Sequence, residues 1–78
     1  MKEFLESIVK RLVDNPDEVT VTKVESENNV IYELKVSPED LGKVIGKRGR
    51  TAQALRTLLT AVAAKAGDPR STLDIIDR

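Results

Sequence analysis

The stretch that most constrains the fold of this chain is Ile45-Gly46-Lys47-Arg48-Gly49, near the middle of the sequence. Two glycines bracket two basic residues, and residues with the apolar spacing of a helix lie on both sides. Because glycine adopts backbone conformations that other residues avoid, this pattern predicts a tight turn between two helices. Such a turn exposes the side chains of Lys47 and Arg48, which can then contact phosphate groups.

Charge is distributed very unevenly along the chain. Residues 41 to 67 contain six basic residues and no acid, although the whole chain has a formal net charge of +0. Residues 1 to 40 contain ten acids and five bases. A neutral total argues against nucleic-acid binding by the chain as a whole, but this segregation of charge predicts it at one face.

Length and composition limit the class of protein. With 78 residues, the chain is expected to form one domain over residues 1–78, with a single small core. It contains no cysteine and no histidine, which removes the thiol nucleophile, the imidazole base and the usual metal ligands. We therefore expect no enzyme, no catalytic residue, no metal, no cofactor and no small-molecule substrate. The absence of a long apolar run or a signal peptide indicates a cytoplasmic protein without membrane contact.

The first half of the chain is predicted to form a helix and two strands. Apolar residues at three- and four-residue spacing between Phe4 and Val13 indicate an amphipathic helix. Residues 19–26 are mostly β-branched and residues 30–36 alternate with a period of two, which indicates an antiparallel hairpin. The alternation slips between Val21 and Val24, which fits either a bulge or an edge strand. The outer face of the hairpin is expected to be polar, with Glu25, Glu33 and Lys35.

The second half begins with a helix start, Ser37-Pro38-Glu39-Asp40. Here Ser37 is the expected N-cap, and Asp40 is expected to reach back to it as in a capping box. A short helix is predicted up to Gly46, and a longer one from about Arg50 to Gly67. A turn at residues 68–70 then leads to a short final strand at residues 73–76.

The predicted order is therefore αββααβ, which is an α+β fold. The second strand, the two following helices and the last strand form a βααβ unit. Its crossover is expected to be right-handed, and it places the last strand parallel to its neighbour. We expect a three-stranded mixed sheet that is covered on one face by three helices.

The segment Val44-Ile45-Gly46-Lys47-Arg48-Gly49-Arg50-Thr51 resembles the signature of the KH domain, in which a Gly-x-x-Gly loop joins two helices. The αββααβ order is similar to the type II, prokaryotic arrangement of that domain. A chain with this domain alone resembles the small bacterial single-KH RNA-binding proteins of the KhpA (YlqC) group. The resemblance covers nearly the whole chain and implies a cytoplasmic binder of single-stranded RNA, such as an RNA chaperone or post-transcriptional regulator. It also implies a homodimer, or a complex with a larger KH protein of the Jag type.

The resemblance also implies which residues contact RNA. A KH domain holds about four single-stranded nucleotides, with the backbone at the loop and the bases in an adjoining groove. By position, the clamp consists of Gly46, Lys47, Arg48 and Gly49. The groove residues are then Val44, Ile45, Ala52 and Leu55, and the additional basic contacts are Lys43, Arg50 and Arg56. The two aromatic residues, Phe4 and Tyr32, lie away from the loop, so we expect weak base preference without aromatic stacking.

Two other functions compete with RNA binding. Two helices joined by a glycine turn also describe a helix-turn-helix DNA reader. The long helix, however, offers mainly Gln53, Arg56, Thr57 and Thr60 for base reading. Alternatively, a KH fold can serve as an interaction or dimerisation module with minor RNA contact, through the alanine-rich latter half of that helix. Preference for duplex DNA would favour the first alternative, and self-association without RNA binding would favour the second.

Overall fold

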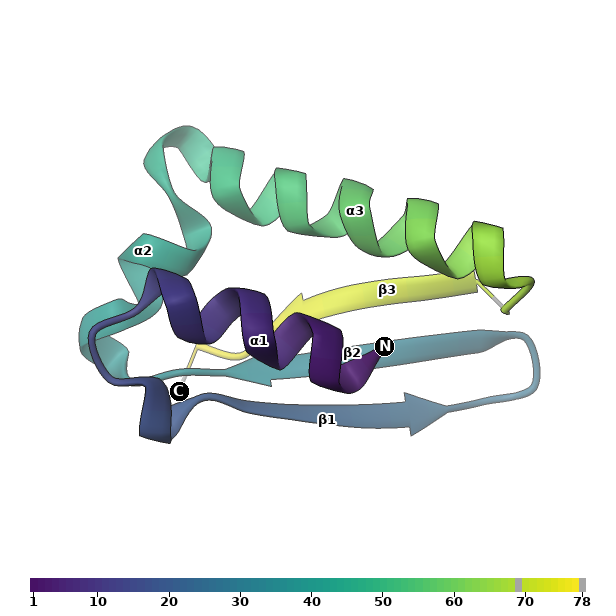
Figure 1. The fold of residues 1–78 in the computed structure, drawn as a ribbon, viewed down its shortest axis with the longest axis horizontal. Coiled ribbons are helices and arrows are strands. Elements are labelled where there is room, and N and C mark those ends of the chain that lie inside the picture. Colours follow the sequence, from purple (N-terminus) through teal and green to yellow (C-terminus); the bar gives the residue numbers. More distant parts are fainter. Residues whose placement is uncertain (69, 78) are drawn as a thin grey trace.

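The computed structural model describes residues 1–68 and 70–77 (Figure 1). Within them, the α-helices are α1 (Lys2–Leu12), α2 (Leu41–Ile45) and α3 (Arg50–Ala66), and the strands are β1 (Thr20–Glu25), β2 (Asn29–Lys35) and β3 (Arg70–Ile75). Short 3-10 segments precede β1, α2 and α3, at Pro16–Glu18, Pro38–Asp40 and Lys47–Gly49. The predicted α+β class and the αββααβ order of a type II KH fold are confirmed.

The strands form one mixed sheet in the order β1-β2-β3. β1 pairs antiparallel with β2, and β3 pairs parallel with β2, as predicted for a strand that follows a two-helix crossover. In β2 the side chains of Val30, Tyr32 and Leu34 are buried, while Ile31 and Lys35 are exposed. Because successive side chains of a strand point to opposite faces, only one face of the described sheet is covered.

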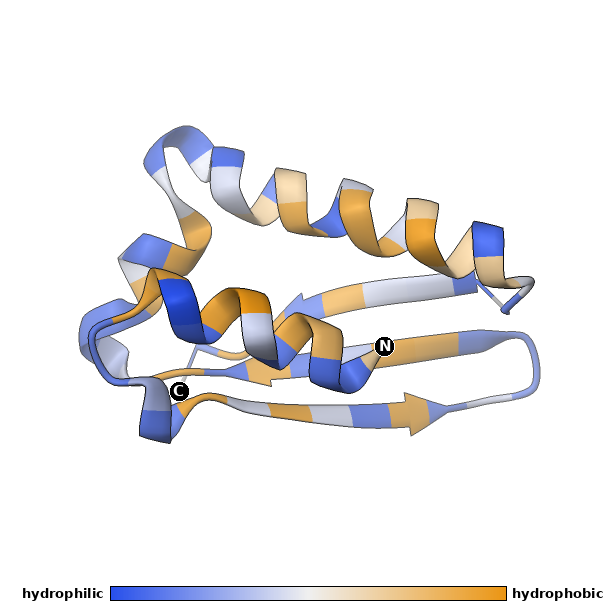
Figure 2. Cartoon of the chain, in the orientation of Figure 1, coloured by the Kyte–Doolittle hydropathy of each residue, from blue (hydrophilic) through white to orange (hydrophobic). Residues whose placement is uncertain are grey.

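The core lies between that face and the helices. The buried residues of α1 are Leu5 and Val9, one helical turn apart, and α3 is buried along Ala52, Leu55, Leu59 and Ala63. Figure 2 shows the apolar segments of both helices interrupted by hydrophilic ones, as expected for helices with one buried side. No helix of the described residues is long and apolar enough to span a lipid bilayer.

The structure decides between a bulge and an edge strand in the hairpin, and it also corrects the placement of one of its acids. β1 pairs with β2 in an unbroken register, with Val24 opposite Ile31 on the uncovered face. The slip in alternation therefore reflects an edge strand with one exposed valine, and not a bulge. Glu25 lies opposite Val30, whose side chain is buried, so Glu25 belongs to the covered face at its end. The placement of Glu25 on the outer face was wrong.

The last strand is longer than predicted. β3 begins at Arg70, because the parallel register with β2 extends back to the pair Asn29 and Arg70. The sequence alone assigned Arg70 to a turn, since a polar residue after Pro69 gives no sign of its pairing partner. Pro69, the centre of that predicted turn, lies outside the described residues.

The predicted capping box at the start of α2 is wrong. No side-chain cap hydrogen bond is made at the start of the Pro38–Asp40 segment. The carboxylate of Asp40 instead accepts hydrogen bonds from the residues that follow α1, Asp14 and Asn15. A tertiary partner, which a local motif cannot reveal, replaces the local one.

Candidate nucleic-acid interface

The connection between α2 and α3 adopts the conformation that its glycines predict. Gly46 has φ 78° and ψ 171°, and Gly49 has φ 73° and ψ 13°. Residues with a side chain rarely adopt either conformation. The N–H of Gly46 donates to the carbonyl of Gly42 at 2.8 Å and closes α2, and the N–H of Gly49 donates to the carbonyl of Gly46 at 3.0 Å. The chain therefore turns within four residues, and α3 starts directly at Arg50.

The two glycines of the loop have different surroundings. A Cβ atom on Gly46 would lie 2.3 Å from Oγ1 and 2.7 Å from Cβ of Thr51. A Cβ atom on Gly49 would meet no atom within 4 Å. Gly46 is therefore required both by its φ and by close packing on the first turn of α3, whereas Gly49 is required by its φ alone. The space beside Gly49 leaves the backbone accessible to a ligand.

Arg48 adopts a strained backbone conformation between these glycines. Among the described residues, it is the one residue other than glycine with a positive φ, at φ 58° and ψ 27°. A left-handed conformation costs a residue with a side chain about 1 kcal/mol. Strain of this kind is concentrated at binding sites, where the surrounding structure holds a residue in a functional geometry.

The basic residues of the loop and of α3 are free to contact a ligand. Lys47, Arg48, Arg50 and Arg56 are all exposed. Within residues 1–68 and 70–77, none of their side chains makes an ion pair or a hydrogen bond. The structure places the first three at or next to the loop, and Arg56 lies about 9 Å further along the axis of α3. Their charges are uncompensated by neighbouring acids and create a positive potential at this end of the molecule.

Lys43, in contrast, is paired with acids of its own chain. Its ammonium donates to the carboxylate of Asp14 and lies 3.9 Å from Oδ1 of Asp40. The hydrogen bond to Asp14, together with the negative charges of Asp14 and Asp40, raises the pKa of Lys43 above its ordinary value. The structure therefore separates Lys43 from the other predicted basic contacts.

The four predicted groove residues have very different exposures. Val44, Ala52 and Leu55 are buried, and Val44 and Leu55 belong to the hydrophobic core. Ile45, at the end of α2, is 37% exposed. Ile45 is therefore available at the surface, whereas the side chains of the other three are not.

A cavity between α3 and β3 adds residues that the sequence did not single out. It has a volume of about 250 Å³ and is lined by Arg56, Thr60, Arg70, Ser71, Thr72 and Leu73. Arg56 and Thr60 are one turn apart on α3, and Arg70 and Thr72 are alternate residues of β3. The i, i+4 and i, i+2 spacings were visible in the sequence. That Arg70 and Thr72 belong to the strand beside α3 was not, because the sequence alone predicted no strand residue before Leu73.

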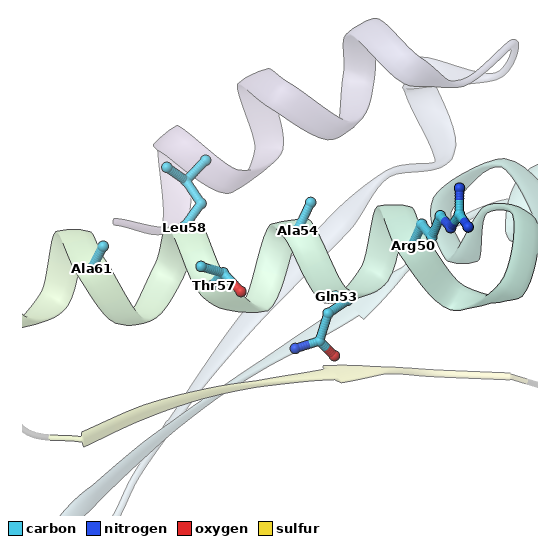
Figure 3. Close-up of a pocket in the computed structure, with 6 residues that line it drawn as sticks. All are labelled: Arg50, Gln53, Ala54, Thr57, Leu58 and Ala61. Carbon is cyan, nitrogen blue, oxygen red and sulfur yellow. The ribbon is translucent and has the colours of Figure 1, made fainter.

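A second surface, open to solvent, runs along the exposed side of α3 (Figure 3). It is formed by Arg50, Gln53, Ala54, Thr57, Leu58 and Ala61. Leu58 is 39% exposed although it is a large apolar residue in the middle of the helix. Small neighbours, Ala54 and Ala61, lie one turn to either side of it. This surface therefore offers an apolar strip whose polar atoms come from a few side chains only.

The chemistry available at the loop is that of positive charge and backbone groups. In the described parts of the chain, no group of three or more His, Cys, Asp or Glu side chains is close enough to hold a metal ion. The acids beside α2, Asp14 and Asp40, are engaged by Lys43 and by backbone N–H groups. The exposed cations of the loop and the open space beside Gly49 suit a negatively charged ligand.

Comparison with known proteins gives a consistent result. The family model described as "KhpA/KhpB, KH domain" matches residues 2–75. A protein of Clostridium acetobutylicum called RNA-binding protein KhpA is 60% identical over 65 residues, which are 83% of this chain and 87% of that protein. Proteins with the same name from Aquifex aeolicus and Listeria monocytogenes are 52% and 49% identical over 77 residues, 99% of this chain and 96% and 100% of theirs. No solved structure matches the chain significantly.

Proposed function

The chain belongs to the KhpA/KhpB family of KH domains, and we propose that it binds single-stranded RNA with the loop from Gly46 to Gly49. One observation supports the position of the site above all. Lys47 and Arg48 are exposed between two glycines and have no partner among the described residues. The relatives of this chain are called RNA-binding proteins, and their ligand is a polyanion that such a loop suits.

The loop holds the RNA backbone by three means. Lys47 and Arg48 attract the phosphates, and the positive dipole end at the N-terminus of α3 favours an anion directly after Gly49. The open space beside Gly49 lets a phosphate approach the main chain. Arg50 contributes a further charge at the first position of α3.

The bases lie along α3, between the loop and the cavity at β3. Ile45 offers aliphatic contact near the loop, and Arg56, Thr60 and Thr72 offer hydrogen bonds at the cavity. Tyr32 is 3% exposed in the core, so it is no stacking platform. With aliphatic and polar contacts in place of stacked aromatic rings, we expect weak preference among bases. Such a binder acts as an RNA chaperone or post-transcriptional regulator in the cytoplasm, without catalysis.

An anisotropy titration tests the site. Short fluorescent single-stranded RNA is titrated at several salt concentrations with the wild type and with Lys47→Asp/Arg48→Asp. If about three phosphates are contacted, log affinity of the wild type falls against log salt with a slope of roughly −2. We expect the variant to lose binding while its circular dichroism remains that of the folded protein.

The matched control changes the same charges elsewhere. Lys10 and Arg11 are adjacent, exposed and basic, and they lie in the last turn of α1. The variant Lys10→Asp/Arg11→Asp has the same net charge as the loop variant. If both variants lose binding equally, the interaction depends on net charge and the loop assignment is wrong.

We propose that the strip on α3 around Leu58 holds a second copy of the chain. Leu58 is a large exposed apolar residue flanked by Ala54 and Ala61, which permit a partner helix to approach closely. The KH domain of a larger, Jag-type protein is the alternative occupant. Light scattering after size exclusion tests this: Leu58→Lys should give monomers, while Phe4→Lys on α1, where Phe4 is 40% exposed, should not. A wild type that is monomeric at high concentration and dimeric only with the larger KH protein would support the alternative.

The helix-turn-helix alternative receives less support from the structure. Arg56, its strongest candidate for base reading, lines the cavity beside β3 together with Thr60. The surface of α3 that faces away from the sheet offers Arg50, Gln53 and Thr57 as polar residues, and its other residues, Ala54, Leu58 and Ala61, are apolar. A competition titration decides, since duplex DNA should displace the labelled RNA poorly if the KH assignment is right.

A further inference from the structure

One buried carboxylate, that of Asp40 directly before α2, is joined by hydrogen bonds to the residues that follow α1. Asp40, the N-cap residue of α2, is 1% exposed. Its Oδ1 accepts from the backbone N–H of Asp14 at 3.2 Å. Its Oδ2 accepts from the backbone N–H of Asn15 at 2.9 Å and from the side-chain amide of Asn15 at 3.0 Å. A buried carboxylate that accepts three hydrogen bonds is firmly held, because without them its charge would be buried and unpartnered.

Lys43 completes this group of side chains, which we call the Asp40 network: Asp14, Asn15, Asp40 and Lys43. Its ammonium donates to Asp14 and lies 3.9 Å from Asp40. Lys43 lies in α2, about one turn after the N-cap residue Asp40, and Asp14 lies beyond the end of α1. The network therefore links the end of α1 to the beginning of α2 across 25 or more positions of sequence.

The helix that the network holds is too short to be stable by itself. α2 has five residues, fewer than the number at which an isolated helix becomes stable in water. Val44 is buried and Leu41 is partly buried against the core, so packing holds one side of the helix. The network adds hydrogen bonds directly before its N-terminal end. At the other end Gly46 starts the loop, about 9 Å from Asp40 along the helix axis.

We propose that Asp40 is a positioning residue for the RNA clamp, and that Lys43 belongs to the Asp40 network and not to the RNA contacts. This inference rests on the proposed function of the loop. If Asp40 fixes the direction of α2, it also fixes where Gly46 and Lys47 stand relative to the N-terminus of α3. Changing Asp40 should therefore weaken RNA binding without removing any phosphate contact.

The salt dependence of binding separates positioning from contact. A residue that contacts a phosphate of single-stranded RNA contributes about 0.7 to the slope of log affinity against log salt. Lys47→Gln should therefore make the slope less negative by about that amount. Lys43→Gln should leave the slope unchanged, because its charge is already compensated by Asp14 and Asp40.

Asp40→Asn is the main variant, measured at a temperature where circular dichroism shows that all of the protein is folded. We expect an affinity about threefold to tenfold weaker, the range typical of mutations in a coupled network, with an unchanged slope. A role in stability alone would leave the affinity of the folded protein as it was. The matched control is Asp17→Asn, which removes the same charge from an exposed acid three residues from Asp14.

The outcomes are distinct. Equal affinities for Asp40→Asn and Asp17→Asn would overturn the positioning role, and a smaller slope for Lys43→Gln would overturn the assignment of Lys43. An unchanged slope for Lys47→Gln would overturn the proposed clamp itself. If Asp40→Asn does not fold, Asn15→Ala replaces it, since it removes one donor of the Asp40 carboxylate. Amide chemical shifts of Gly46 and Gly49 should then move although Asn15 is far from them in sequence, and shifts confined to the vicinity of Asn15 would refute the inference.

Discussion

At the N-terminal end of α2, Asp40 is buried and its carboxylate accepts three hydrogen bonds, whereas at the C-terminal end Lys47 and Arg48 are exposed and unpartnered within the described residues. The backbone differs in the same way. Arg48 is in a left-handed conformation and its glycine neighbours have positive φ, while Asp40 is in the ordinary helical region. A helix of five residues thus connects a hydrogen-bonded carboxylate with a strained loop whose cations have no partner among the described residues. We infer that stability is provided at one end and binding capacity at the other.

Substitution at Gly42, inside α2, and at Gly46, directly after it, should give the largest difference in stability. Gly46→Ala combines a positive φ with a clash against Thr51, so we expect a loss of about 3 kcal/mol in the free energy of unfolding. Gly42 lies within α2 with open space where a Cβ atom would be added. Gly42→Ala should therefore gain about 0.5–1 kcal/mol. Urea unfolding measures both, and similar values for the two variants would show that the loop tolerates a side chain at its first glycine.

The pH dependence of stability should distinguish the Asp40 end. Burial by itself raises the pKa of Asp40, but the hydrogen bonds from Asp14 and Asn15 and the charge of Lys43 lower it below its ordinary value of 3.8. Because the pKa is lower in the folded state, this stabilisation is complete above pH 3.8 and is lost as pH falls through the folded-state pKa. The titratable groups around Asp40 are Asp14 and Lys43.

We therefore expect Asp40→Asn to lower the melting temperature at pH 7 by about 5–10 °C. The difference from the wild type should shrink as the pH falls below 3.8. Melting curves by circular dichroism between pH 7 and pH 2.5 test this. Asp17→Asn is the control and should follow the wild type, and a difference for Asp40→Asn that stays constant with pH would contradict a charged Asp40.

A smaller loss of stability is expected at the second glycine of the loop. Gly49→Ala meets no clash but retains an unfavourable positive φ, which costs about 1 kcal/mol. The added methyl group occupies the space through which a phosphate approaches the main chain. RNA affinity should therefore fall about tenfold, or about 1.4 kcal/mol. Anisotropy and urea unfolding together test the comparison, which fails if Gly49→Ala destabilises as much as Gly46→Ala or binds RNA normally.

Relief of strain at Arg48 should have the smallest effect on stability, and in the opposite direction. Arg48→Gly removes the cost of the left-handed conformation, which stabilises the folded state. Glycine also raises the conformational entropy of the unfolded chain, which offsets part of the gain, so we expect a net stabilisation of about 0.5 kcal/mol. RNA affinity should fall, and the salt slope should become less negative by about 0.7. Arg48→Ala is the matched control, since it removes the same charge and keeps the strain. It should bind as weakly as Arg48→Gly without being stabilised.

Local patterns predicted much of this molecule. The turn at Gly46 and Gly49, the long helix ending at Gly67 and the period of two in β2 all depend on neighbours within a few residues. The parallel placement of β3 was also predicted, because a two-helix crossover permits few arrangements. The position of Asp40 was not predicted, since its partners are 25 and 26 residues away and Ser37, three residues before it, offered a local alternative.

In the candidate site, too, features that depend on neighbouring residues were predicted and features that depend on distant partners were not. Lys47, Arg48 and Arg50 were predicted as exposed cations and are exposed. Lys43 was grouped with them by its position in the basic stretch, but the structure pairs it with acids from the other half of the chain. Arg70 was missed because its place beside Arg56 depends on the register of β3 against β2 and on the packing of α3.

The sequence by itself determined the loop, the order of the elements and the segregation of charge, because glycine conformations, hydrophobic periods and charge are properties of short segments. Only the tertiary structure decided which charges remain available. It neutralised Lys43, left Lys47 and Arg48 unpartnered and brought Arg70 to α3. The physical reason is that compensation of a charge depends on groups within a few ångströms in space, and the compact packing of a short chain brings those groups from distant positions.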